Sequence, residues 1–128
     1  MRLAALTLVA MLTATAAQAN EVFGTWQTEK SDGKYLHVDV HACASDASKV
    51  CGTISAAFGG ATESNVGKPI IWDMTPAAAN TWEDGKIWKA DEDEVYDSEM
   101  ELSGGKLKVS GCILFGQICK SQTWPRVK

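Results

Sequence analysis

The sequence HVDVH places two imidazoles and a carboxylate at alternate positions, at His37, Asp39 and His41. Alternate side chains of a β-strand share one face, and imidazole with carboxylate is a ligand set that suits zinc or copper. Side chains two positions apart on a strand lie about 6–7 Å apart, however, and the sequence contains no third histidine. The pattern therefore favours a solvated strand face, and no metal is assigned to it.

A second group of candidate ligands is the acidic run formed by Asp91, Glu92, Asp93 and Glu94. Carboxylate oxygens bind calcium, but the run lacks the glycine and the distal glutamate of an EF-hand loop. Charged residues at a turn also keep exposed strand edges soluble. We interpret the run as the charged tip of a β-hairpin.

Catalytic motifs are absent from the sequence. It contains neither the G-x-S-x-G turn of α/β-hydrolases nor the H-E-x-x-H helix of zinc proteases. Paired carboxylates act as acid and base only in a cleft that tunes their pKa values, and nothing in the sequence indicates such a cleft. The chain is therefore predicted not to be an enzyme and to need no cofactor.

Polar residues in the last predicted strand suggest binding instead. Alternation places Lys120, Gln122, Trp124 and Arg126 on one face, so all four point inward if the tryptophan does. An inward cation in an apolar barrel can bind a carboxylate or phosphate head group. The alternative is a barrel filled with side chains, in which Lys120 extends to an open end and reaches water.

The elements that must position these residues are β-strands. Apolar and polar residues alternate, and helical periodicity is absent after the N-terminal segment. Strands are predicted over 22–29, 34–43, 50–58, 95–103, 106–113 and 118–127. The predicted inward side chains are Leu36, Val38, Val40, Val50, Ile54, Ala56, Phe58, Tyr96, Ser98, Met100, Leu102, Leu107, Val109 and Ile113. Short consecutive strands joined by turn residues indicate an antiparallel sheet, and few strands with one apolar face each favour a closed barrel or a sandwich.

The segment from Gly59 to Thr81 breaks this alternation. It contains Gly, Pro and Asn residues, which favour loops. We predict a surface loop with one short strand at 70–72 and a helical turn near Ala77. A functional lid is the alternative, because long loops in compact domains often close over sites.

Four cysteines, Cys43, Cys51, Cys112 and Cys119, allow three disulfide pairings. Pairing of sequence neighbours, Cys43–Cys51 and Cys112–Cys119, is favoured because each pair flanks a turn. Each bond would close a short loop and contribute about 2.5 kcal/mol. Zinc is disfavoured because the C-x-x-C spacing of zinc sites is missing. Alternation places Cys112 and Cys119 on the outer face, where they can meet across a hairpin.

The first nineteen residues have the features of a secretory signal peptide. Met1 and Arg2 precede the apolar run Leu3–Leu12, and Ala17-Gln18-Ala19 is a cleavage site. The run is too short to span a membrane. Cleavage near Ala19 would leave a single domain over 20–128 in the periplasm or outside the cell. It would carry 11 basic and 16 acidic side chains, a charge of −5 with His neutral, which argues against nucleic acid as a partner.

The two ends of the domain carry complementary side chains. Trp26 follows Gly24 in the first predicted strand, and Arg126 lies in the last. First and last strands are neighbours in a closed up-and-down barrel, so the guanidinium can stack on the indole, a contact worth about 0.5–2 kcal/mol. We predict that this pair closes one end of the barrel.

These residues support a resemblance to known families. The G-x-W of the first strand with an arginine on the last is similar to the signature of the calycins, which include lipocalins, fatty-acid-binding proteins and avidins. The stretches GTWQTE, CASDASKVCGTI, DGKIWKADEDEVYDSEMEL, LKVSGCI and CKSQTWPRV resemble a bacterial secreted family labelled domain of unknown function 2147. The resemblance implies a calycin-like fold and an envelope location, with no established activity. Trp88 and Pro125 depart from the family pattern, and Pro125 cannot donate a ladder hydrogen bond.

The sequence thus predicts an all-β, antiparallel up-and-down barrel of roughly eight strands that is calycin-like. Its expected role is non-catalytic binding of a small, hydrophobic or amphipathic ligand. The predicted ligand-binding residues are Trp26, Tyr96, Met100, Lys120, Gln122 and Arg126. Three alternatives remain: an envelope protein-interaction module with a filled barrel, whose partner is unknown, a weak metal site at His37, Asp39 and His41, and an enzyme.

Overall fold

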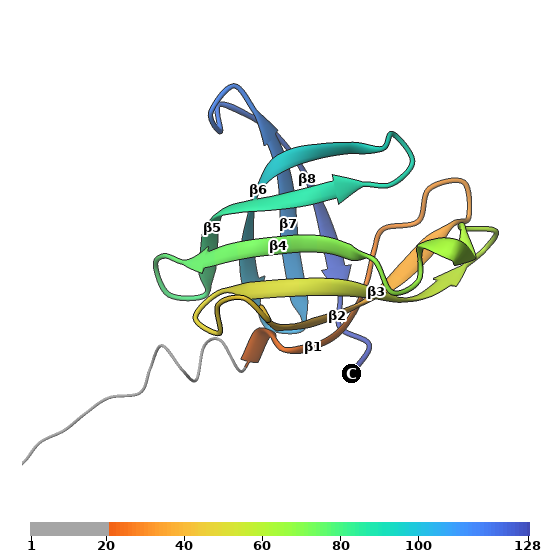
Figure 1. Ribbon diagram of the computed structural model, residues 1–128, viewed down its shortest axis with the longest axis horizontal. Coiled ribbons are helices and arrows are strands. Elements are labelled where there is room, and N and C mark those ends of the chain that lie inside the picture. Colours follow the sequence, from red (N-terminus) through yellow and green to blue (C-terminus); the bar gives the residue numbers. More distant parts are fainter. Residues whose placement is uncertain (1–20) are drawn as a thin grey trace, which may run out of the picture.

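The computed structural model describes residues 21–128 and shows eight antiparallel strands, each paired with the next along the chain (Figure 1). They are β1 (Gly24–Gln27), β2 (Tyr35–Ala42), β3 (Val50–Phe58), β4 (Pro69–Pro76), β5 (Thr81–Lys89), β6 (Glu94–Ser103), β7 (Lys106–Ile113) and β8 (Ile118–Pro125), with a short 3-10 helix, η1 (Glu63–Asn65), before β4. The sheet curls into a half-barrel, as the all-β, up-and-down prediction requires. The predicted signal peptide lies outside the described residues.

Alternation positions the side chains of β6 and β7 as expected. Ser98, Met100 and Leu102 are buried between exposed neighbours in β6, and Leu107 and Val109 are buried in β7. Paired residues of an antiparallel ladder share a face, and Met100 pairs with Val109 and Leu102 with Leu107. These side chains therefore belong to the concave, inner face of the sheet.

The core fills the concave face near β1 and the end of β8. Its buried members are Val22, Trp26, Val38, Val40, Val50, Ile54, Ile70, Ile71, Met74, Trp82, Met100, Leu102, Leu107, Val109 and Trp124. Trp26 and Trp124 are 0% and 1% exposed and are its largest fully buried side chains. This half of the barrel interior is packed with side chains, and burial of aromatic surface dominates its stability.

The edges of the sheet meet through β1 and the residues that follow β8. Thr25 donates its backbone N–H to Lys128 O (2.6 Å), and Val127 donates to Thr25 O (2.7 Å). Further along the same seam, the carboxylate of Glu29 accepts a hydrogen bond from the backbone N–H of Thr123 in β8 (2.9 Å). This side-chain contact takes the place of a strand-to-strand hydrogen bond. A β-carbon at Gly24 would lie 2.5 Å from Lys128 O, so glycine permits this close approach.

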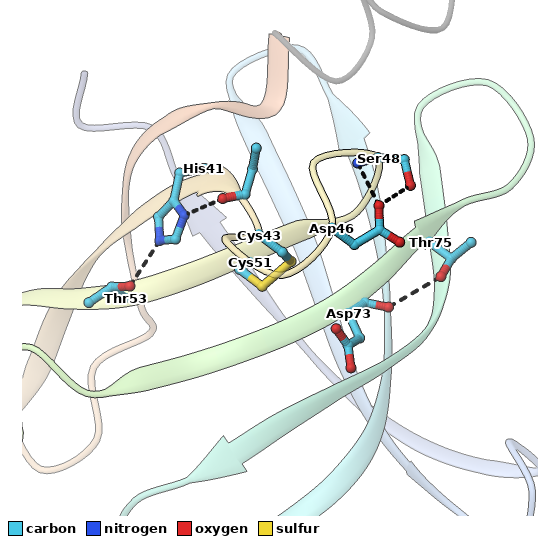
Figure 2. The surroundings of a disulfide bond; sticks show 9 residues. His41, Cys43, Asp46, Ser48, Cys51, Thr53, Asp73 and Thr75 are labelled. Atoms are coloured by element: carbon cyan, nitrogen blue, oxygen red, sulfur yellow. Dashed lines mark hydrogen bonds between the residues drawn. A yellow bond between two sulfur atoms is a disulfide. The ribbon is translucent and has the colours of Figure 1, made fainter.

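Both disulfides form as predicted. Cys43–Cys51 joins the end of β2 to β3 (Figure 2), and Cys112–Cys119 joins β7 to β8 beside the hairpin turn. Cys112 and Cys119 are directly opposite in the ladder, on the same face as Lys108. The outward position that alternation predicts for these two cysteines is thus confirmed.

The prediction for Gly59 to Thr81 was wrong in two respects. The segment contains the full strand β4 rather than a three-residue strand. Near Ala77 a tight turn connects β4 to β5, in which Ala77 N–H donates to Thr81 O (3.0 Å) and Thr81 N–H to Ala78 O (3.1 Å), so no helical turn forms. The segment is part of the barrel wall.

Ala56 and Phe58 were also assigned to the wrong face, since they are opposite His37 and Tyr35 on the outer face. The register between β2 and β3 shifts between His37 and Val38, and such a bulge reverses which side chains point inward. The ring of Phe58 consequently stacks on Tyr35, with centroids 4.9 Å apart, and is 36% exposed. The prediction of which β3 side chains point inward therefore holds before the bulge, at Val50 and Ile54, and fails after it.

Candidate functional site

One end of the barrel is closed by Trp26 and Arg126, which we call the plug. The guanidinium carbon of Arg126 lies 4.3 Å from the centroid of the Trp26 ring. Arg126 also donates to the carbonyl oxygens of Phe23 (3.1 Å) and Glu21, and Trp26 Nε1 donates to Val22 O (2.9 Å). The predicted stack is confirmed, and its hydrogen bonds tie the plug to the N-terminal segment.

Gln122 belongs to the seam beside the plug. Its Oε1 accepts a hydrogen bond from Trp124 Nε1 (2.7 Å), and the N–H of Glu29 lies 3.4 Å from the same atom. The buried indole N–H of Trp124 is thereby satisfied, as buried donors require. Gln122 is exposed, so its carbonyl is engaged while the rest of its amide faces solvent.

Cross-strand rows place Lys120 on the concave face. Lys120 is opposite Gly111, which is opposite Ser98. The next row of paired residues, nearer the plug, consists of Met100, Val109 and Gln122. Because paired residues share a face, Lys120 lies on the same side of the sheet as the buried core, yet it is exposed and forms no ion pair with another residue of 21–128.

Gly111 lies against Ile87 and Tyr96 on this part of the concave face. A β-carbon there would lie 3.5 Å from Cγ2 of Ile87 and 3.6 Å from Cβ of Tyr96, in ordinary contact. One row further out, Ile113 pairs with Ile118, and they are 46% and 52% exposed. We call this region the open half of the barrel; it comprises Ile87, Tyr96, Gly111, Ile113, Ile118 and Lys120.

The predicted ligand-binding residues separate into two groups. Trp26 and Met100 are 0% and 3% exposed, so little of either side chain is available to a ligand, and Arg126 is engaged in the plug. Tyr96 and Lys120 belong to the open half, with Gln122 one row away. Their role in binding stays a prediction. Ile87, Ile113 and Ile118 complete the surface, and the inward alternation of Ile113 was the sequence signal for it.

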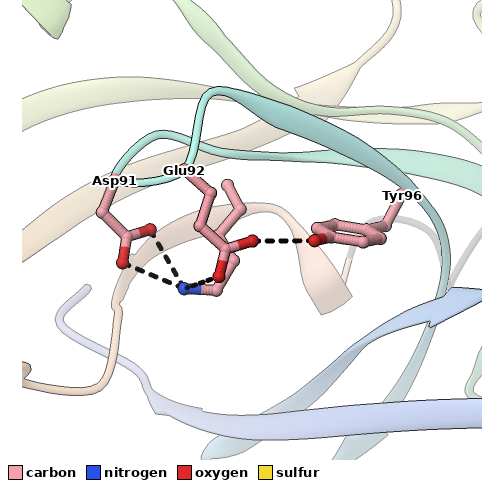
Figure 3. A network of polar contacts seen from close by, with 4 residues as sticks. Asp91, Glu92 and Tyr96 are labelled. Carbon is pink, nitrogen blue, oxygen red and sulfur yellow. Dashed lines mark hydrogen bonds and ion pairs between the residues drawn. The ribbon is translucent and has the colours of Figure 1, made fainter.

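The acidic run forms the tip of the β5–β6 hairpin, as predicted (Figure 3). Tyr96 donates its hydroxyl to Glu92 Oε1 (2.7 Å), and Lys89 Nζ lies 3.0 Å from Asp91 and 3.6 Å from Glu92. The hydrogen bond to Glu92 holds the pKa of the Tyr96 phenol above its ordinary value of 10.0. The bond to Asp91 likewise raises the pKa of Lys89.

Replacing Glu92 with alanine is expected to lower the pKa of Tyr96 toward the ordinary phenol value. The carboxylate accepts a hydrogen bond from the neutral phenol, and its negative charge disfavours the phenolate, so both effects disappear in Glu92→Ala. The phenolate absorbance measured during an alkaline titration checks this. Tyr35 is the other tyrosine of the chain and serves as internal control; an unchanged titration curve would contradict the observed bond.

The HVDVH residues lie on the outer face and have separate partners. Asp39 accepts from Thr25 Oγ1 (2.7 Å), and His41 contacts Ala42 O (2.8 Å) and Thr53 Oγ1 (2.9 Å) (Figure 2). His37 packs on Phe58, with ring centroids 4.6 Å apart. Within residues 21–128, the one group with metal-ligating geometry is Glu99 with Cys112 and Cys119, whose sulfurs form a disulfide.

Two further hollows lie elsewhere on the surface. One, of about 430 Å³, is beside the plug and is lined by Glu21, Asn80, Leu102, Gly104 and Arg126. The other, of about 230 Å³, is over β5–β7 and is lined by Thr81, Trp82, Glu83, Glu99, Met100, Glu101, Lys108 and Ser110. Neither contains a residue of the open half.

An eight-stranded up-and-down sheet with a tryptophan–arginine plug defines a lipocalin-like barrel. The structure is similar to "Protein HP1028 from the human pathogen Helicobacter pylori", described as belonging to the lipocalin family, with a TM-score of 0.67 over 84% of this chain and 83% of that one. Sequence identity is 14%, so the likeness concerns the fold. No curated protein matches the chain.

The chain belongs to the family described as "Uncharacterized protein conserved in bacteria (DUF2147)", whose model matches residues 24–126. The match begins at Gly24 in β1 and ends at Arg126 of the plug, so it covers all eight strands. The predicted family membership and lipocalin-like fold are therefore confirmed. No helix within residues 21–128 has the length and apolar character needed to cross a bilayer.

Proposed function

We propose that this chain is an exported, non-catalytic protein that binds a small amphipathic ligand in the open half of its barrel. The observation that carries the proposal is the division of the concave face. The half near the plug is filled by core side chains, whereas the other half exposes Ile113 and Ile118 around Lys120. Lipocalin-like folds bind ligands in general, and the open half is the part of the interior with free surface.

The chemistry of the open half favours a ligand with an apolar body and an anionic head. Ile87, Ile113 and Ile118 offer aliphatic contacts, and Tyr96 adds an aromatic surface. Burial of apolar surface would supply most of the affinity, at about 25 cal/mol per Å². The ammonium of Lys120 would bind a carboxylate or phosphate through charge-assisted hydrogen bonds, and no carboxylate of residues 21–128 competes for it within 4 Å.

Export is supported by two independent features. Two disulfides are consistent with an extracytoplasmic protein, because such bonds persist in oxidising compartments. The N-terminal segment has the charge, apolar run and Ala17-Gln18-Ala19 site of a signal peptide. We therefore place the proposed function in the periplasm or outside the cell.

Titration calorimetry with sodium dodecanoate tests the proposal. Gly111→Phe is expected to abolish binding, because a ring added beside Ile87 and Tyr96 would cover the apolar surface that the ligand is proposed to contact. Lys120→Glu is expected to weaken dodecanoate about tenfold or more by replacing an attractive charge with a repulsive one. The same variant should not weaken dodecylamine, whose head group is cationic.

Lys106→Glu is the matched control, because Lys106 is also an exposed lysine but lies on the outer face at the far end of β7. It should leave dodecanoate binding unchanged. Equal losses in both lysine variants would mean that net charge alone matters, and no heat with the unaltered chain would overturn the proposal for this ligand class. Native mass spectrometry of protein purified from its own envelope would identify a natural ligand.

The alternative function, an envelope protein-interaction module, is favoured by the packed state of the core half. A filled barrel is a rigid scaffold that presents loops. If this alternative is correct, Gly111→Phe leaves binding of the protein partner unchanged, and the native mass spectrum shows the chain without a bound small molecule. The two functions are therefore separated by the same two measurements.

A further inference from the structure

The turn between β7 and β8 presents an apolar surface to solvent. Residues 113–118 read Ile-Leu-Phe-Gly-Gln-Ile and carry no charge. Ile113, Leu114 and Ile118 are 46%, 59% and 52% exposed, and Phe115 is 99% exposed. Figure 1 shows this hairpin projecting from the barrel, at the top of the view. We call residues 113–118 the hairpin tip.

The backbone conformation of the hairpin tip is energetically unfavourable for the residues that adopt it. Leu114 and Phe115 have φ of +55° each, followed by Gly116 at +86°. L-residues with bulky side chains disfavour this left-handed region, and hairpin turns of this kind are normally built from Asn and Gly. Phe115 is 99% exposed and Leu114 59% exposed, so neither turn geometry nor burial in the core explains these two side chains. Such an outlier points to a function.

The hairpin tip is also held in place from below. The Cys112–Cys119 bond joins the strands immediately before the tip, and Gln117 N–H donates to Leu114 O (3.1 Å) across the turn. A covalently fixed turn loses little conformational entropy when it binds. The apolar side chains are therefore presented in a preorganised arrangement.

We propose that the hairpin tip docks the protein onto a zwitterionic lipid surface by inserting Phe115 and Leu114 into the interface. The tip is convex and uncharged, which suits a bilayer interface. A buried phenylalanine covers about 150–250 Å², whereas a stable protein complex needs about 800 Å² on each partner. The tip is thus too small to hold a second copy or a folded partner, but a few inserted side chains suffice for reversible lipid binding.

Charge determines which lipid surface fits. Glu99 lies beside the Cys112–Cys119 bond, and the β5–β6 hairpin carries four acidic residues, Asp91–Glu94. These five acids outnumber Lys89 and Lys120, two lysines of this end of the barrel. The chain as a whole carries −4. These charges would be repelled by anionic head groups, so a zwitterionic surface is the expected one. Docking would bring the open half, which shares Ile113 and Ile118 with the tip, close to the lipid, but docking itself requires no ligand.

Vesicle flotation tests the proposal with the disulfide-bonded chain that begins at Asn20, which contains every strand and lacks the apolar N-terminal run. The chain is expected to float with phosphatidylcholine vesicles. Phe115→Asn should reduce partitioning about tenfold or more by removing the inserted ring, and it should not lower the thermal midpoint, because Asn tolerates the left-handed region. Phe115→Trp should retain binding.

Phe58→Asn is the control, because Phe58 is an exposed aromatic on the outer face away from the tip, and it should float like the unaltered chain. Mixing phosphatidylglycerol into the vesicles should weaken binding. Absence of flotation with phosphatidylcholine, or equal flotation of Phe115→Asn, would overturn the proposal. So would a Phe115-dependent dimer in sedimentation velocity without vesicles, because the occupant would then be a second copy. None of these results depends on dodecanoate binding.

Discussion

Replacing Trp26 with alanine is expected to lower the free energy of unfolding by about 3–5 kcal/mol, as for other buried tryptophans. The ring is 0% exposed, so its removal leaves a cavity that the surrounding sheet can only partly fill. The variant also loses the hydrogen bond from Nε1 to Val22 O and the surface on which Arg126 stacks. Three contributions are therefore lost from one position.

Urea unfolding followed by circular dichroism measures this loss. Trp72→Ala is the matched control, because Trp72 is a half-buried indole outside the core cluster, opposite Lys86 on the outer face. Its replacement should cost clearly less. A loss below about 1 kcal/mol for Trp26→Ala would be typical of a surface residue and would contradict both the plug and the meeting of the chain ends.

Sequence patterns were sufficient where each strand keeps a regular alternation. In β6 and β7 apolar residues recur at every second position apart from Ser98, so the faces of Met100 and Val109 followed directly. The disulfide pairing was predicted because each pair of cysteines flanks a turn, and alternation agreed for Cys112 and Cys119, which share the outer face. Trp26 and Arg126 indicated that the chain ends meet, because a stacked cation and indole need neighbouring strands.

Bulges explain why β4 was predicted too short and why β5 (Thr81–Lys89) was not predicted at all. Asp73 and Asp84 have φ of +58° and +60°, so the alternation of both strands is interrupted. Gly85 accommodates this: a β-carbon there would lie 2.5 Å from the sulfur of Met74. An interrupted alternation resembles a loop when one strand is read alone, and only the pairing of the two strands shows that both are continuous.

The open half could be predicted only in part. Alternation placed Tyr96 and Lys120 on the inner face, and the register agrees. It could not show that Met100 is covered whereas Lys120 is exposed, because coverage depends on the curl of the sheet and on how far the core extends. The hairpin tip did leave a signal, since leucine and phenylalanine stand in a turn where Asn or Gly is the rule.

Removing both disulfides is expected to cost about 5 kcal/mol, the largest effect anticipated for this chain. The bonds join residues 8 and 7 positions apart, and the chain-entropy model assigns about 2.5 kcal/mol to each such loop. They lie in different hairpins, so their contributions should add. A loss of this size equals the total stability of many small domains, so the quadruple variant with serine at Cys43, Cys51, Cys112 and Cys119 should be largely unfolded at 37 °C.

Urea unfolding of the two double variants and of the quadruple variant measures each contribution. Cys43→Ser with Cys51→Ser, and Cys112→Ser with Cys119→Ser, should each lose about half of the total. Dithiothreitol should destabilise the unaltered chain by the same amount and leave the quadruple variant unchanged, which separates loss of the bond from loss of the buried sulfur at Cys43 and Cys112. A total loss under about 1 kcal/mol would mean that strand pairing alone holds both hairpins, and the Cys112–Cys119 bond would then have to be explained by the rigidity that it gives to the hairpin tip.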